Sequence, residues 1–336
     1  MEWETSFDHS QGLIRRLEEA ALPGSFVLLL TGSYGDIFPN LALLRSFHES
    51  TGKPVTVILS SRWSLCAARF SFGFVKYITF PPSLQSQIHG AILNSGRPFK
   101  RSPGFLYPLL PTLHPLIADL ILTGRVTDYE VKRLILGLEP KAPFFVPELS
   151  AARLTKVRSY LLERNIVLGK SVVLAFKTNS NPAPPHSIQM QILNHLQNEN
   201  LDICINISDS FQELSTKESS EHRKASVVDI PCDAPVETVE MIGGYIGAAH
   251  GLTAILATFG DNKVIAQTTL AKPELIPNNG RLINPDIIRL NLCLRDELRN
   301  NLIEIVSDLG SAAASAGIGE FVRLCHAEFR KNTPIQ

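Results

Sequence analysis

Apolar residues follow two alternating patterns along this chain. Segments of strand length that are wholly or mostly apolar lie at 26–30, 55–59, 74–80, 171–176, 201–207, 226–230, 244–248 and 262–268, and the run at 26–30 is unbroken. Between them, apolar residues recur every three or four positions, as in 8–21, 37–50, 127–138, 149–166, 187–200, 235–243, 251–259, 297–310 and 319–331. Fully apolar runs are typical of parallel strands that are buried on both faces, and the other spacing is that of helices. The pattern therefore predicts an α/β protein with parallel sheets.

Local signals refine two of these elements. Residues 31–36, TGSYGD, predict a turn, and Pro39 then fits the first turn of a helix over 37–50. The segment 97–115 is rich in proline and aromatic residues, and we expect a substrate-facing or structural loop there. The tail after residue 297 is expected to end in helices.

The length of 336 residues favours two domains. The segment 138–149 contains prolines 140, 143 and 147, which is typical of a linker. We therefore expect Rossmann-like domains at 1–145 and 146–336, with the last helices able to pack back on the first domain.

Composition excludes several classes of protein. Lys+Arg and Asp+Glu both number 32, so no global charge attracts nucleic acid. The five cysteines are scattered without a C-x-x-C pair, which argues against a disulfide scaffold or a zinc ribbon. The N-terminus is acidic and no apolar run reaches the length of a membrane span. We expect a cytoplasmic protein that can touch the inner face of a membrane at its surface.

The turn after the first predicted strand is one candidate site. Ligands of open parallel sheets bind beyond the carboxyl ends of the strands, and glycines allow close approach to the backbone. Asp36 has two interpretations that the sequence leaves open: it caps its own helix, or it accepts a proton from a nucleophile. The candidate residues on this side are Gly32, Ser33, Tyr34, Gly35 and Asp36.

A second small-residue turn, GAAHGLT, joins the strand and helix of the segment 244–260. Free N–H groups at a helix start suit a diphosphate, and His250 could donate to a phosphate oxygen. The alternative is a tight strand–helix crossing. The candidate donor-phosphate residues are Gly247, His250, Gly251, Leu252 and Thr253.

Two weaker candidates complete the set. Lys177, Thr178, Asn179 and Ser180 follow a buried strand, where a lysine and hydroxyls could hold phosphate, although a solvated loop is the plainer reading. A basic stretch among aromatic residues could bind an anionic acceptor or be an ordinary exposed loop; it contains Arg97, Lys100 and Arg101. The nine histidines form no metal-binding motif, so we expect no metal.

Three stretches together resemble the two-domain GT-B glycosyltransferases, and most closely the ADP-heptose:lipopolysaccharide heptosyltransferase family. They are GSYGDIFPNLALLRSF, the segment from LILGLEPKAPFF through VVLAF, and YIGAAHGLTAILATFG. The sequence departs from the family at Tyr245, where an acidic residue is usual, and at Phe176-Lys177-Thr178, where His-Pro-Gly is expected. A heptose donor is therefore not implied.

The resemblance implies two Rossmann-like domains that face a cleft. It implies transfer of a sugar from a nucleotide-diphospho donor to a hydroxyl of a glycan or glycolipid, with inversion and without metal or cofactor, as in polysaccharide or lipopolysaccharide biosynthesis. Asp36 matches the family's proposed general base, Gly247 and His250 match the donor-phosphate loop, and residues 177–180 match a loop that contacts the diphosphate. A nucleotide-sugar epimerase or hydrolase of the same fold, or a non-catalytic module, are the alternatives.

Overall fold

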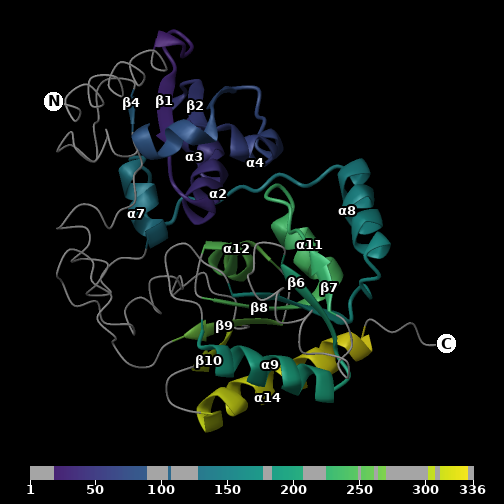
Figure 1. The fold of residues 1–336 in the computed structure, drawn as a ribbon. Coiled ribbons are helices and arrows are strands. Elements are labelled where there is room, and N and C mark those ends of the chain that lie inside the picture. The colour runs from purple at the N-terminus through teal and green to yellow at the C-terminus, as the bar shows by residue number, and fades with distance from the viewer. Residues whose placement is uncertain are drawn as a thin grey trace, which may run out of the picture. The chain divides into compact units, whose positions relative to one another are not determined.

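The computed structural model describes residues 19–88, 105–106, 128–176, 184–206, 225–248, 251–260, 264–269, 302–306 and 311–331. The chain splits into two compact units, Met1–Glu148 and Leu149–Gln336. Each unit contains one parallel sheet with helices beside it (Figure 1). The predicted α/β class with parallel sheets is confirmed. Among the described helices, none combines the length and the apolarity that crossing a bilayer requires.

The first unit is built on a sheet with the strand order β3-β2-β1-β4, in which every pair is parallel. The strands are β1 (Phe26–Leu30), β2 (Val55–Ser60), β3 (Val75–Phe80) and β4 (Phe105–Leu106). The helices are α2 (Tyr34–Ala42), α3 (Leu44–Thr51), α4 (Ser64–Arg69) and α7 (Asp128–Ile135), with short 3-10 turns at Ser61–Trp63 and Pro82–Leu84. Every residue of β1 and β2 is buried, as the apolar run of β1 and the mostly apolar sequence of β2 predict.

The second unit has the strand order β10-β9-β8-β5-β6-β7, again all parallel. The strands are β5 (Ser171–Ala175), β6 (Asp202–Asn206), β7 (Ser226–Val228), β8 (Gly243–Ala248), β9 (Ile265–Thr269) and β10 (Leu302–Val306). The helices are α8 (Ala151–Glu163), α9 (His186–Asn198), α11 (Pro235–Ile242), α12 (Gly251–Phe259) and α14 (Ser311–Lys331). When the strands of this unit are numbered from one in chain order, their arrangement in the sheet is that of the dinucleotide-binding fold. In that fold the strand order reverses between the first and the fourth strand, which here are β5 and β8.

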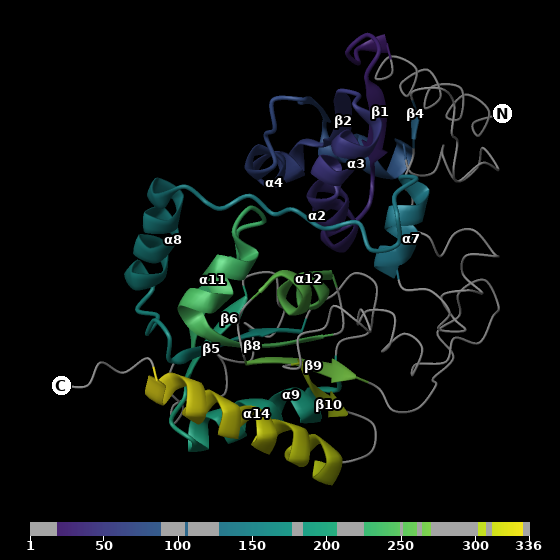
Figure 2. The same ribbon diagram turned by 180° about the vertical axis from the view of Figure 1, so that it is seen from behind.

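Helices cover both faces of the second sheet (Figure 2). Helices α9 and α14 pack on one face, and α11 and α12 pack on the other. The core under α9 and α14 contains Val172 and Leu174 of β5, Ile192 of α9, and Phe321 and Cys325 of α14. Alternate residues of β5 thus face opposite layers, which explains why the whole strand is buried.

Three local predictions are wrong. The segment 297–310, predicted as a helix, contains the strand β10, because Leu302–Val306 pairs with β9 and buries Ile305. The segment 97–115, predicted as a loop, contains the short strand β4 paired with β1. Pro39 lies inside α2 and not in its first turn, because the helix begins at Tyr34; lacking an N–H, Pro39 cannot bond the preceding turn, and α2 ends at Ala42.

The predicted linker, residues 138–149, contains no helix or strand. Hydrogen bonds attach it to the first unit. The Phe145 N–H donates to the Ala42 carbonyl at 2.7 Å, and the Ser46 hydroxyl donates to the Pro143 carbonyl at 2.6 Å. Arg69 Nε donates to the Pro147 carbonyl at 2.9 Å. The unit boundary at Glu148 follows directly after the last of these anchors.

Candidate functional site

Asp36 closes the turn after β1 and starts α2. Ser33 is the N-cap residue, and its backbone N–H and its hydroxyl both donate to Asp36 Oδ2 at 2.9 Å. A carboxylate in this position satisfies one of the orphan N–H groups at the helix start. The capping interpretation of Asp36 is therefore confirmed, and any chemistry of this carboxylate has to proceed alongside that role.

Gly32 gives the Asp36 carboxylate its space. A Cβ built at residue 32 would lie 2.5 Å from the Cβ of Asp36 and 2.6 Å from its Oδ2. The turn is also held from outside, because Gln85 Nε2 donates to the carbonyls of Thr31 at 2.9 Å and Gly32 at 3.2 Å. Gln85 follows the 3-10 turn after β3 and was not among the sequence candidates. Its role could not be read from the sequence, since it depends on β1 and β3 ending at the same edge of the sheet.

Lys132 of α7 lies beside Asp36, and sequence reasoning missed it. Its Nζ is 3.6 Å from Asp36 Oδ1, and the side chains are 3% and 11% exposed. Lys132 also lies over the Tyr129 ring, with Nζ 5.7 Å from the ring centroid. The signal in the sequence is faint: Lys132 follows Tyr129 by three positions, so both share one helix face, and Tyr129 is buried. The turn therefore brings together a buried carboxylate, a buried cation and the hydroxyl of the exposed Ser33.

Tyr34, predicted on the acceptor side, packs among aromatic rings. Its ring stacks on Trp63 with centroids 5.5 Å apart and 14° between the planes, and it meets Phe38 edge-on. Arg62 lies over the Trp63 ring with its Cζ 4.5 Å from the ring centroid, which is within the range of a cation–π contact. These rings lie next to the Asp36 turn because α2 starts at the end of β1 and Trp63 follows the neighbouring β2.

At the carboxyl edge of the second sheet, the ends of β5 and β8 are neighbours. Ala175 pairs with Gly247 in the parallel register, so the chain leaves both strands at the same level. In sequence, the candidates Lys177, Thr178, Asn179 and Ser180 come two to five residues after Ala175, and His250 comes three after Gly247. These five residues lie outside the described residues, as do Arg97, Lys100 and Arg101.

Tyr245 explains why residue 247 is a glycine. The Tyr245 side chain is fully buried, and a Cβ built at residue 247 would lie 2.5 Å from its Cζ. The Tyr245 hydroxyl is 3.1 Å from Thr253 Oγ1, which itself donates to the Ala248 carbonyl at 2.7 Å. The departure from the family at Tyr245 is thus an internal packing element, and the Thr253 hydroxyl stabilises the turn before α12.

Gly251 and Leu252 are half-buried at the start of α12, while Thr253 is 1% exposed. The first N–H groups of a helix have no partner within that helix, so this start is the part of the turn that can face an anion. Within the described residues, no three His, Cys, Asp or Glu side chains form a group that could hold a metal ion.

The sheet order of the second unit defines a doubly wound α/β fold. The sequence matches no protein-family model and no curated protein sequence. Among solved structures, the chain is similar to the glycosyl transferase family 9 protein from Veillonella parvula, with a TM-score of 0.57 and 7% identity over 92% of this chain and 98% of that chain. The E. coli heptosyltransferase WaaC with ADP gives a TM-score of 0.52 and 11% identity over 90% and 99%.

A third similar structure is the iron-containing dodecameric glycosyltransferase TibC from enterotoxigenic E. coli H10407. Its TM-score is 0.52, with 14% identity over 92% of this chain and 77% of that chain. At such low identities the likeness shows the fold. The chain therefore has the GT-B fold of glycosyltransferases, and the predicted resemblance to the heptosyltransferases is confirmed at that level.

Proposed function

We propose that this protein is a glycosyltransferase that moves a sugar from a nucleoside-diphospho-sugar to a hydroxyl group of a glycan or glycolipid, with inversion and without a metal. The observation that carries the proposal is the pairing of Ala175 with Gly247 at the point where the strand order reverses. Ligands of doubly wound sheets bind beyond the strand ends at this point. The similar WaaC structure is described with ADP, which supports a nucleotide at such a site.

The donor would be held by the second unit. As the sugar bond breaks, the departing diphosphate gains negative charge, which backbone N–H groups and cations can stabilise. We assign this task to the N–H groups at the start of α12, together with Lys177 and His250. The hydroxyl of Thr253 is excluded from it, because it is buried and hydrogen-bonded to Ala248 and Tyr245.

Asp36 would accept the proton of the attacking hydroxyl. Its Oδ2 already accepts two hydrogen bonds from Ser33, so Oδ1, which faces Lys132, is the oxygen that we assign to the proton. Lys132 and Ser33 supply positive charge and hydrogen-bond donors around the carboxylate, which hold its position. The reaction requires the acceptor hydroxyl to reach Oδ1 and the anomeric carbon at once.

The direct test is a mass-spectrometric transfer assay with a panel of nucleotide sugars and glycan acceptors. We expect Asp36→Asn to abolish transfer while nucleotide binding persists, and Asp229→Asn, an exposed carboxylate change, to leave transfer unaltered. Turnover of Asp36→Asn at the wild-type rate would remove Asp36 from the mechanism. Nucleotide release without an acceptor would instead favour a hydrolase or an epimerase, and unchanged turnover in a chelator would support reaction without a metal.

A further inference from the structure

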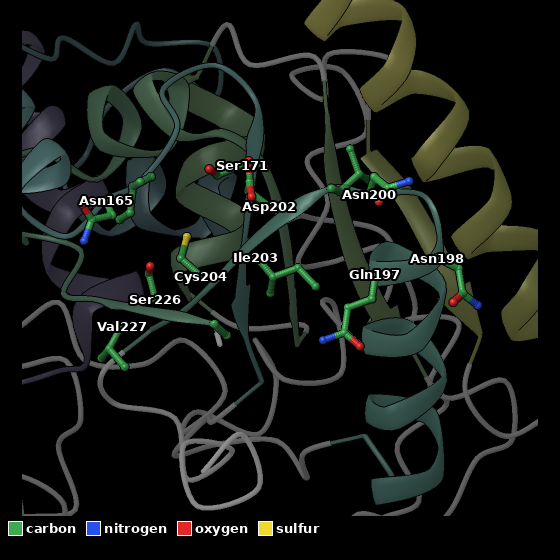
Figure 3. Close-up of a pocket in the computed structure, with 13 residues that line it drawn as sticks. Asn165, Ser171, Gln197, Asn198, Asn200, Asp202, Ile203, Cys204, Ser226 and Val227 are labelled. Carbon is green, nitrogen blue, oxygen red and sulfur yellow. The ribbon is translucent and has the colours of Figure 1, made fainter. Parts of the chain in front are cut away.

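A cavity lies at the edge of the second sheet opposite the proposed donor edge (Figure 3). Its volume is about 820 Å³, which is within the usual range for small-molecule sites. The walls come from the loop after α8, the last turn of α9, the loop from α9 into β6, and the first residues of β5, β6 and β7. Because β5, β6 and β7 all begin here, the cavity belongs to the amino edge and shares no residue with the proposed donor site.

Carboxamide side chains dominate the polar part of this cavity. They belong to Asn165, Gln197, Asn198 and Asn200. Asn165 and Asn200 follow the ends of α8 and α9 in left-handed backbone conformation, with φ of 57° and 56°. This conformation explains why asparagine stops each helix, and it also brings two amides to the rim of one cavity. Each amide offers both a hydrogen-bond acceptor and two donors.

The polar lining has unused hydrogen-bonding capacity. Gln197 Oε1 is buried from solvent and has no hydrogen-bond partner among the described residues. A buried acceptor without a partner costs about 1–3 kcal/mol. Because protein atoms cover Gln197 Oε1, a ligand hydroxyl pairs with it only when the Gln197 amide turns toward the cavity, and that pairing removes the cost.

The charge of the lining argues against a phosphorylated ligand. Among the described residues that line the cavity, Asp202 is the single charged one, and none is Lys, Arg or His. The carboxyl ends of α8 and α9 add partial negative charge at the rim. The rest of the wall is aliphatic, with Ile166, Leu201 and Ile203. Amides beside aliphatic side chains match a neutral molecule that has hydroxyl groups on its edge and C–H groups on its faces.

We propose that this cavity binds a neutral saccharide, and that the saccharide is the glycan part of the acceptor, bound away from its reacting hydroxyl. The second half of this statement rests on the proposed transferase function, whereas the saccharide site itself does not. Such a site raises the local concentration of a long acceptor without taking part in the chemistry.

The test is saturation-transfer NMR on the full chain with maltotriose, mannotriose and chitotriose, followed by titration. We expect at least one trisaccharide to bind, with Gln197→Ala and Asn198→Ala each weakening it about two- to tenfold, as loss of one or two hydrogen bonds does. Asn194→Ala is the matched control, because Asn194 is an exposed amide on the same helix that does not line the cavity.

A nucleoside diphosphate added to the same samples separates this proposal from the transferase proposal. We expect ADP and UDP to leave the trisaccharide signal unchanged. Trisaccharide binding without any nucleotide binding would support the saccharide site and contradict the proposed transferase function. Absence of trisaccharide binding, wild-type affinity in both Gln197→Ala and Asn198→Ala, or displacement of the trisaccharide by ADP or UDP would each overturn the cavity site.

Discussion

The ammonium of Lys132 lies 3.6 Å from Oδ1 of Asp36, with both side chains almost withdrawn from water. The two residues come from distant parts of the chain, the start of α2 and the middle of α7. Removing one partner of a buried ion pair leaves an uncompensated charge, and that is far costlier than losing an exposed pair. This relationship couples the stability of the first unit to the candidate catalytic carboxylate.

We therefore predict that Lys132→Met lowers the free energy of unfolding by about 3 kcal/mol. Urea unfolding followed by circular dichroism measures it. The control is Arg45→Met, which removes an exposed ion pair with Glu49 and a guanidinium contact with the Phe145 ring, and should cost about 1 kcal/mol or less. Adding Asp36→Asn to Lys132→Met should recover part of the loss, because the buried charge is then gone. Equal effects of Lys132→Met and Arg45→Met would show that Lys132 and Asp36 do not form a buried pair.

Gly247→Ala should destabilise the second unit by about 1–3 kcal/mol, the usual cost of overpacking. The added Cβ would overlap the Tyr245 ring, which is buried and cannot move into solvent. Gly73→Ala is the matched control, because no atom lies within 4 Å of a Cβ at that position. Thermal unfolding of both variants gives the comparison. If Gly247→Ala and Gly73→Ala have the same melting temperature, Tyr245 does not lie against residue 247.

Gly319→Ala should stabilise the protein by about 1 kcal/mol. Gly319 lies inside the long helix α14, where glycine is less favourable than alanine by about that amount, and a Cβ there meets no other atom within 4 Å. The midpoint of urea unfolding should rise. A lower midpoint would mean that the surface around Gly319 is closely covered.

The cysteines should differ in reactivity with iodoacetamide. Burial raises the pKa of the Cys204 and Cys325 thiols above their ordinary value, so both stay protonated as the pH rises through the range where free cysteines ionise. Cys232 is half-buried. At pH 8, peptide mass spectrometry should find Cys232 alkylated before Cys204 and Cys325, and urea should expose Cys204 and Cys325. Native-state alkylation of Cys204 as fast as Cys232 would contradict the buried core around β6.

Regular elements with a single strong pattern were predictable from the sequence. β1 has the bounds that its apolar run predicts, and β2 and β5 match theirs to within one residue, since strands buried on both faces need continuous apolar residues. The segment of β10 was predicted wrongly because its apolar pattern is ambiguous. Leu302–Val306 carries apolar residues that suit either a helix or a strand, and pairing with β9 decides the outcome.

The candidate site was predictable only in part. The turn around Asp36 and the glycine at 247 could be located, because small residues after buried strands mark the carboxyl edge of a sheet. Lys132 and Gln85 could not, since each reaches its partner through a fold contact between distant segments. Tyr245 looked like a change within the donor site, whereas its ring is packed inside against Gly247 and Thr253.

The central claim is that a nucleoside diphosphate binds beyond the ends of β5 and β8. A titration of the full chain with ADP, UDP and GDP, read as a shift in Tm, tests it most directly. We predict that at least one of them stabilises the protein, by about 2.7 kcal/mol at one hundred times its Kd. Lys177→Met and His250→Ala should each reduce that shift, and Lys141→Met, a change at an exposed lysine, should leave it intact. No shift with any nucleotide, or an equal shift in all three variants, would contradict the account.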